Sequence, residues 1–153
     1  MNVSLINSAN LSVRHRLICR GAEPESISLK VRYGLIDHPD LGPILIDAGY
    51  APRVVSGQGR GIALRTYGKI LSPNIAMEGH PEVALGHLGY RLEDVQHVIL
   101  THLHADHVGY LDLFPQARIH TSQDCIDLIA QGRALSLLHQ GIFRELLPAF
   151  HKS

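Results

Sequence analysis

The sequence predicts an α/β fold with a mixed sheet and flanking helices, and three observations support this. Residues 27–35 alternate apolar and polar side chains, residues 44–46 form a short apolar run, and strand and helix patterns follow one another from residue 97 to 131. Alternation with a period of two is typical of a half-buried strand, whereas a strand–helix succession is typical of parallel α/β architecture. A length of 153 residues fits one compact domain.

The first two strands are predicted to pair as an antiparallel hairpin. Residues 37–43 read DHPDLGP and supply the Asp, Pro and Gly residues that favour turns between strands. Residues 44–46 are apolar on both faces, which predicts a strand deep in the sheet.

Residues 50–80 are interpreted as a flexible connection. They contain the stretch SGQGRG, but no Lys-Ser/Thr follows it and its glycine spacing fits neither the P-loop nor the dinucleotide fingerprint. This segment also contains four basic residues that could contact an anionic substrate: Arg53, Arg60, Arg65 and Lys69.

The remaining elements follow from local signals. Residues 81–88 are predicted to be helical because Pro81 suits a first turn and Gly89 suits a helix end, and residues 92–95 add a further turn. Residues 98–100 and 117–120 are predicted to be parallel strands. A helix is then expected up to Gly132, with Thr121 and Asp124 as a capping box and Ile126, Ile129 and Ala130 on its apolar face.

Composition excludes several classes of protein. Fourteen Lys and Arg residues balance fourteen Asp and Glu residues, so nothing indicates a nucleic-acid partner or a polybasic membrane contact. No apolar run approaches the ~18 residues of a membrane span, and the amino terminus lacks the apolar centre of a signal peptide. Cys19 and Cys125 lack metal-type spacing and are expected to be reduced thiols. We therefore expect a cytoplasmic protein with a small-molecule substrate.

Histidine is the unusual residue, with 11 copies, and three of them fall in the segment THLHADHVG at residues 101–109. In extended backbone, side chains at i and i+2 point the same way, so His102 and His104 can converge while Leu103 turns into the core. On a helix the two rings would be ~200° apart and could not chelate one ion. If the chain then turns, Asp106 and His107 reach a second point close by.

These donors suit a metal centre. Imidazole nitrogens and carboxylate oxygens bind zinc, iron or manganese, and two such ions about 3.5–4 Å apart can share one activated hydroxide. The isolated histidines elsewhere are interpreted as surface or hydrogen-bonded residues without a role.

The segment THLHADHVG resembles the hallmark motif of the metallo-β-lactamase superfamily of metal-dependent hydrolases. Upstream, ILIDAG resembles the strand of that family that ends in an Asp-x-Gly turn, and downstream FPQARIHTSQ resembles the strand and helix entry after the motif. The resemblance covers roughly residues 27–131. LKVRYGLIDHPDLGPILIDAG followed by VILTHLHADHVG is most similar to the lactonase-like branch, which includes acyl-homoserine lactonases.

This resemblance implies an αββα sandwich, of which the chain would form the N-terminal αβ half. It implies zinc as cofactor, two ions in a complete site, with iron or manganese as alternatives. His102 and His104 would bind the first ion, and Asp106 and His107 the second. Asp106 would also be catalytic, by orienting the attacking water or passing on its proton, and Asp47 would hold the metal-binding loop in place from behind. The implied reaction is attack of a metal-activated hydroxide on an ester, lactone or related carbonyl.

The family's remaining ligands, a third histidine, a bridging aspartate and a last histidine, lie in its second half. Here 46 residues follow His107, and their histidines, His120, His139 and His151, stand in unlike contexts. We therefore expect residues 1–153 to form a single, apparently truncated domain with impaired hydrolase activity. Its exposed apolar face would favour self-association or pairing with a missing C-terminal half.

Two other interpretations stay open. The chain could be a non-catalytic remnant that binds metal weakly or packs against a partner. It could also be a thioesterase of the glyoxalase II-like kind or a phosphodiesterase of the same superfamily, although the neutral charge disfavours a nuclease.

Overall fold

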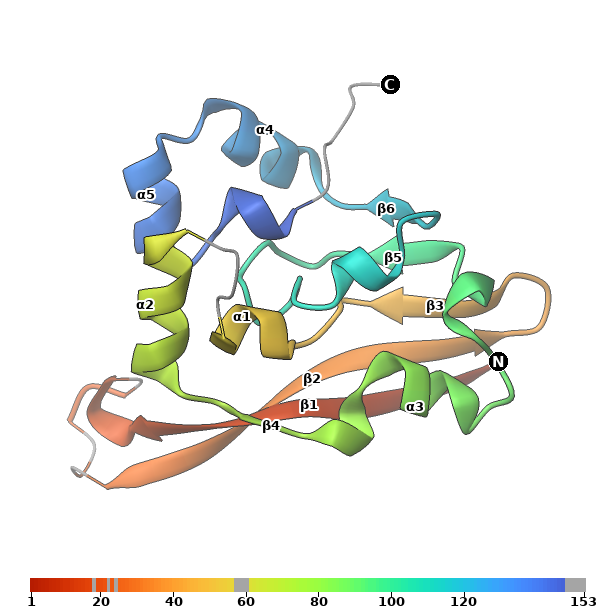
Figure 1. The fold of residues 1–153 in the computed structure, drawn as a ribbon, viewed down its shortest axis with the longest axis horizontal. Helices are drawn as coiled ribbons and strands as arrows, with labels where there is room; N and C mark the ends of the chain where they lie inside the picture. The colour runs from red at the N-terminus through yellow and green to blue at the C-terminus, as the bar shows by residue number, and fades with distance from the viewer. Residues whose placement is uncertain (18, 22, 24, 57–60, 148–153) are drawn as a thin grey trace.

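The computed structural model describes residues 1–17, 19–21, 23, 25–56 and 61–147. In this described part of the chain, six strands form one mixed sheet in the order β4-β1-β2-β3-β5-β6 (Figure 1). The strands are β1 (Asn2–Arg14), β2 (Ser26–His38), β3 (Gly42–Ile46), β4 (Asn74–Ile75), β5 (His97–Ile99) and β6 (Arg118–His120). Strands β4, β1, β2 and β3 pair antiparallel, whereas β3, β5 and β6 run parallel.

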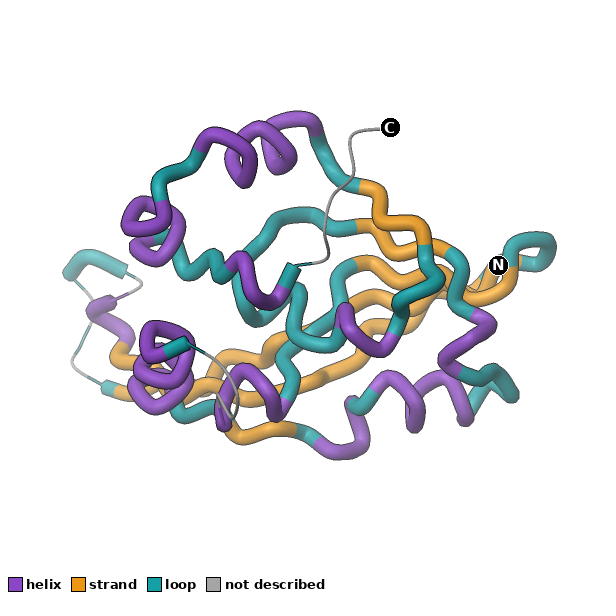
Figure 2. Tube along the Cα trace, turned by 45° about the horizontal axis from the view of Figure 1, so that its top comes forward, coloured by secondary structure: helices purple, strands orange, loops and turns teal. Residues whose placement is uncertain are grey.

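Within the described residues, five α-helices border the sheet, which forms one continuous layer (Figure 2). They are α1 (Pro52–Ser56), α2 (Ile62–Leu71), α3 (Pro81–Gly86), α4 (Gln123–Gln131) and α5 (Ala134–His139). Short 3-10 turns at 15–17, 77–79, 92–94, 111–113 and 144–146 complete the described chain. A single core joins sheet and helices, and its fully buried members include Leu45, Val98, Val54, Leu64, Leu85 and Leu137.

The predicted hairpin and the predicted parallel pair are both confirmed. Residues 34–38 of β2 pair antiparallel with residues 42–46 of β3, and β3 lies between β2 and β5, deep in the sheet as expected. β5 and β6 are parallel and each lies within about one residue of its predicted range. The mixed sheet therefore brings the end of β3 beside the end of β5.

The interpretation of residues 50–80 as a flexible connection is wrong for the described part of that segment. Helices α1 and α2, strand β4 and a 3-10 turn occupy it. Gly68 hid the second helix from sequence reasoning, because glycine disfavours a helix interior. Here it permits close packing, since a Cβ at Gly68 would lie 2.5 Å from the carbonyl oxygen of Val54 in α1. Residues 57–60, the glycine-rich stretch, lie outside the described residues.

Strand β1 had no sequence prediction, although it is among the longest strands. It pairs with β2 from Asn2 to Arg14, with a register shift between Asn7 and Ala9. Polar residues at 7, 8 and 10 interrupt its apolar alternation and remove the period-two signal.

The N-cap of helix α4 lies one residue after the N-cap predicted from the sequence. Ser122, rather than Thr121, is the N-cap, and its Oγ accepts a hydrogen bond from the backbone N–H of Cys125 at 3.3 Å. Thr121 instead donates its hydroxyl to the Leu100 carbonyl at 3.2 Å. The apolar face of α4 is only half-buried, through Cys125, Leu128 and Ile129. Cys19 and Cys125 are free thiols, as expected.

Among the described helices, none combines the length and the apolar character that crossing a bilayer requires.

Candidate metal centre

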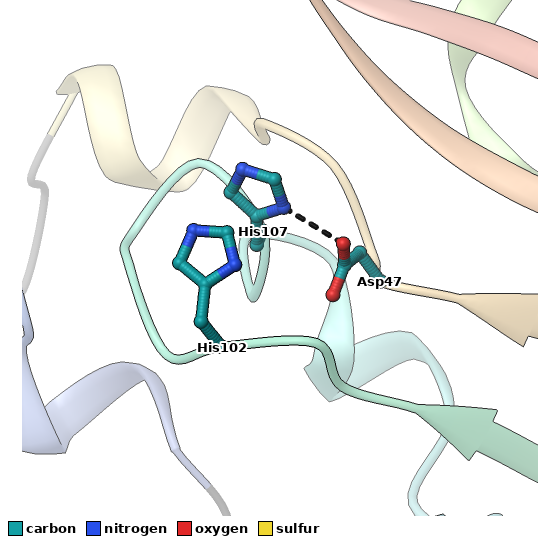
Figure 3. A group of neighbouring side chains, drawn as sticks. All are labelled: Asp47, His102 and His107. Atoms are coloured by element: carbon teal, nitrogen blue, oxygen red, sulfur yellow. Dashed lines mark hydrogen bonds and ion pairs between the residues drawn. The ribbon is translucent and has the colours of Figure 1, made fainter. Parts of the chain in front are cut away.

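The candidate site forms where β3 and β5 end side by side. The two strands are parallel with Ile46 opposite Ile99, so the segments that leave them start at the same edge of the sheet. After β3 comes the Asp47-Ala48-Gly49 turn, and after β5 comes the histidine loop, which we define as residues 101–109 (Figure 3).

Backbone hydrogen bonds join the turn to the strand end and to the histidine loop. They run from Asp47 N–H to Ile99 O (2.8 Å), from Ala48 N–H to His107 O (2.6 Å), from Gly109 N–H to Gly49 O (2.8 Å) and from Tyr110 N–H to Ala48 O (3.2 Å). Gly109 makes this approach sterically feasible, because a Cβ there would lie 2.4 Å from the Gly49 carbonyl oxygen. The turn and the loop are therefore one packed unit.

Ser8 of β1 supports the turn from below. Its buried hydroxyl donates to the Val31 carbonyl at 3.1 Å and accepts the backbone N–H of Tyr50 at 2.9 Å. Gly49 has φ 61°, and a Cβ there would lie 2.8 Å from the Ser8 Cβ. Glycine thus meets both a conformational and a packing requirement at this position.

Asp47 carries a buried carboxylate on left-handed backbone, with φ 61°. Oδ1 accepts from the Thr101 backbone N–H at 2.9 Å, and Oδ2 accepts from the Thr101 hydroxyl at 2.8 Å and from Nδ1 of His107 at 2.8 Å. Burial alone would raise the pKa of Asp47, but the hydrogen bonds from His107 and Thr101 outweigh it and hold the pKa below its ordinary value. Asp47 is therefore an ionised carboxylate, and both of its oxygens accept hydrogen bonds.

His107 bridges Asp47 and Asp106. Its Nδ1–H points at Asp47, and its Nε2 lies 3.5 Å from Oδ2 of Asp106. Burial opposes protonation of His107, yet the hydrogen bond to Asp47 and the charges of Asp106 and Asp47 raise its pKa. The same contacts turn Nε2 away from Asp47, beside the Asp106 carboxylate.

His102 is oriented through Thr101. The Thr101 hydroxyl has one proton, which goes to Asp47, so its oxygen accepts from Nδ1–H of His102 at 2.9 Å. This assigns the Nδ1–H tautomer to His102 and leaves its Nε2 lone pair free. Burial, together with the neighbouring His107 and His104, lowers the pKa of His102, which keeps the ring neutral, the form that binds a metal.

Three rings of the histidine loop lie close together. The ring centroids of His102 and His104 are 4.7 Å apart, and those of His102 and His107 are 3.9 Å apart. Leu103 is 1% exposed and points into the core, as its spacing predicted. Asp47, His102 and His107 each present a ligand-type atom within 4.8 Å of the others (Figure 3).

This donor set fits zinc, iron or manganese, since neutral imidazoles and carboxylates are their common protein ligands. Among the described residues, the group of ligand-type atoms close enough to hold one ion is Asp47, His102 and His107, and it includes neither His104 nor Asp106. Asp47 is better suited to orienting two of those rings, because His107 and Thr101 already engage both of its oxygens.

The contacts of two residues of the site were not predicted from the sequence, although Arg53 is among the basic residues considered as partners of an anionic substrate. Thr101 was passed over because its role depends on a carboxylate far away in sequence. Arg53, on α1, donates to the carbonyl oxygens of Gly109 and of Val108 (3.3 Å for the latter) and forms an ion pair with Asp112 at 3.2 Å. Arg53 thereby connects the end of the histidine loop to α1. The neighbouring residues in sequence do not predict this contact.

Comparison with known proteins gives a consistent result. The family model described as the Metallo-beta-lactamase superfamily matches residues 30–122. A probable metallo-hydrolase of Mycobacterium tuberculosis is 30% identical over 133 residues, which cover 87% of this chain and 39% of the relative. An N-acyl homoserine lactonase of a Bacillus species is 35% identical over 68 residues, which are 44% of this chain and 27% of the relative. The chain thus spans well under half the length of these relatives.

Solved structures share the fold. A mutant of AiiA from B. thuringiensis, with N-decanoyl-L-homoserine bound at its active site, matches with a TM-score of 0.66 at 23% identity, covering 86% of this chain and 52% of that one. A metal-dependent hydrolase of Staphylococcus aureus, described as probable, matches with a TM-score of 0.63 at 17% identity, covering 93% and 57%. At these identities the similarity is one of fold alone.

Proposed function

The chain belongs to the metallo-beta-lactamase superfamily, and from that premise we propose that it carries the amino-terminal part of the metal centre of a hydrolase for esters, lactones or related carbonyl compounds. The single observation that carries the proposal is the histidine loop, where three imidazoles and one carboxylate gather at the joint ends of β3 and β5.

Each residue has a proposed part. His102 and His104 bind a first zinc ion, and Asp106 and His107 bind a second; iron or manganese would suit the same atoms. A bound ion would polarise the substrate carbonyl and lower the pKa of a nearby water. Asp106 orients the attacking water and accepts its proton. Asp47 positions the His107 ring directly and the His102 ring through Thr101.

We propose a lactone as the substrate. The support is that a curated relative is named N-acyl homoserine lactonase and that a solved structure of the same fold holds the product N-hexanoyl-L-homoserine. Ring opening needs only an activated water and a polarised carbonyl, both of which the proposed centre would supply.

In the proposed centre each ion has two protein ligands, whereas a catalytic zinc ion usually has three protein ligands, so the ligand set is incomplete. We propose that a further polypeptide layer completes it by packing on the face of the sheet that lies opposite the core. Apolar side chains stand exposed there: Val3 is 60%, Leu5 69% and Ile99 40% exposed. Register places Leu5, Gly34, Ile46 and Ile99 in one row across four strands.

The positive charge of this face indicates which polypeptide could pack on it. Lys30, Arg32 and Arg118 are exposed on this same face, and no carboxylate occupies an outward position of the strands within the described residues. A second copy of the chain would bring like charges together. The layer we propose is therefore a polypeptide with an apolar centre and acidic edges, and on its own the chain would bind metal weakly and turn over slowly.

Zinc titration of the purified chain tests this function. We expect His102→Ala and His107→Ala each to weaken zinc binding by about 10-fold or more. Removing a residue that only hydrogen-bonds to a ligand already lowers metal affinity by that factor, and removing the ligand itself should lower it at least as much. His87→Ala, at an exposed histidine, is the matched control. The rate of hydrolysis of N-hexanoyl homoserine lactone, measured from the acid that ring opening releases, should fall in the same two variants. Unchanged zinc affinity in both would overturn the proposal.

A further inference from the structure

A second pair of histidines lies outside the histidine loop, on adjacent parallel strands. Nδ1 of His97 on β5 is 3.1 Å from Nε2 of His120 on β6, and the ring centroids are 5.2 Å apart. His97 is half-buried and His120 is exposed, so in the chain by itself, without the further layer proposed above, solvent reaches the pair. Among the described residues neither ring has another hydrogen-bond partner.

The backbone under this pair is held firmly. The parallel ladder pairs Val98 with Ile119, and hydrogen bonds run from Arg118 N–H to the Gln96 carbonyl (2.9 Å) and from Leu100 N–H to the His120 carbonyl (2.8 Å). The two Cα positions are therefore fixed, and binding an ion would need only small rotations of the rings.

The separation of the nitrogens suits a shared ion. Two nitrogens at about 2.0–2.1 Å from one transition-metal ion, at angles between square-planar and tetrahedral, lie about 2.9–3.4 Å apart. The 3.1 Å between His97 and His120 falls inside that range.

The surroundings restrict which ion could bind. Magnesium and calcium need oxygen ligands, and the outward positions of β3, β5 and β6 carry no carboxylate: Gly42, Ile44, Ile46, His97, Ile99, Arg118 and His120. The nearby positive charge of Arg118 weakens the binding of every cation. Only an ion with strong affinity for imidazole overcomes that charge, and copper(II) ranks highest among the divalent ions of the first row.

We propose that His97 and His120 bind a divalent transition-metal ion, copper(II) in preference to nickel or zinc, at a site separate from the histidine loop. Each ring binds through the lone pair of its facing nitrogen and keeps its proton on the other nitrogen. The hydrogen bond between the rings is lost, its proton passes through water to the outer nitrogen of the same ring, and no net proton is released. Water fills the remaining positions around the ion.

Titration of the full chain with copper(II) alone, followed by NMR of the histidine ring protons, tests the site. Once the histidine loop is saturated, further copper(II), a paramagnetic ion, should broaden the ring signals of His97 and His120. His97→Gln and His120→Gln should each weaken this binding by about 10-fold or more, since losing a ligand costs at least what losing its supporting partner costs. His87→Gln, at an exposed histidine elsewhere, should bind as the unmodified chain does.

His102→Ala separates this proposal from the function proposed above, because that variant should leave the broadening of His97 and His120 unchanged. Sharp His97 and His120 signals after the histidine loop is saturated with copper would overturn the proposal, and so would unmodified affinity in either Gln variant. Should a Gln variant fail to fold, the signals of the unmodified chain decide alone.

Discussion

Nδ1 of His107 lies 2.8 Å from Oδ2 of Asp47, and this contact joins the turn after β3 to the loop after β5. The same carboxylate holds Thr101, whose hydroxyl accepts the Nδ1–H of His102. One buried acid therefore orients two rings and leaves Nε2 of each ring available, an arrangement typical of histidines that bind metal.

Asp47→Asn is the direct test of that arrangement. Asn tolerates the left-handed backbone at this position, so the change removes the charge without adding strain. Zinc affinity of the chain should fall about 10- to 100-fold, measured by competition with a chelating indicator. Asp40→Asn, at an exposed acid in the turn between β2 and β3, should have no effect. Equal zinc affinity in both variants would show that Asp47 does not orient the ligands.

Gly109→Ala should loosen the packed unit of turn and loop. A Cβ at this position would lie 2.4 Å from the Gly49 carbonyl oxygen and 2.5 Å from the Ala51 nitrogen, so the backbone must move. We expect a loss of about 1–3 kcal/mol in the free energy of unfolding, measured with urea. Gly86→Ala is the control, because it ends α3 with nothing within 4 Å of its added Cβ. Equal stabilities would argue against close packing at Gly109.

Arg53→Met should destabilise the chain more than Asp112→Asn. The methionine keeps part of the apolar stem but removes the guanidinium donor of the Gly109 carbonyl, which costs about 1–3 kcal/mol, whereas the Val108 carbonyl keeps the Leu111 N–H. Asp112→Asn removes only the charge of a half-exposed ion pair, worth about 0–1 kcal/mol. Urea unfolding of both variants measures the difference, and the reverse order would contradict the proposed tie to α1.

Alkaline pH should destabilise the chain through Tyr67. Burial and the charge of Asp106 raise the pKa of Tyr67 to about 12, whereas a phenol in an unfolded chain titrates near about 10. The stability that this difference represents is complete below the unfolded pKa. It is lost as pH rises through the folded one, because the unfolded state releases the proton first.

The free energy of unfolding should therefore fall less steeply with pH in Tyr67→Phe than in the unmodified chain. Urea unfolding at a series of alkaline pH values checks this. Parallel slopes in the two proteins would contradict it.

What could be predicted from sequence was local. His102, Leu103 and His104 followed from the two-residue period of extended backbone, which needs no knowledge of the rest of the chain. The hairpin of β2 and β3 followed from alternation and from turn residues, which are local too.

What could not be predicted depends on distant partners. Gly68 weakens the local helix signal of α2, and its purpose becomes clear only when α1 packs against it. Thr101 and Arg53 have ordinary neighbours in sequence, and their roles come from Asp47 and from the carbonyls of Val108 and Gly109. β1 lacks an alternating pattern at the point where Ser8 turns inward to support the turn.

Ser8 has a practical consequence for handling the protein. Its hydroxyl reaches the backbone of Tyr50, and its Cβ would meet any side chain at Gly49, so the eighth residue of the chain supports the turn that carries Asp47. Trimming the amino terminus, or fusing a rigid tag close to it, would act on the candidate metal centre through this one serine, although the deleted residues themselves bear no metal-binding group. Expression designs should leave β1 intact and place tags at a flexible distance from it.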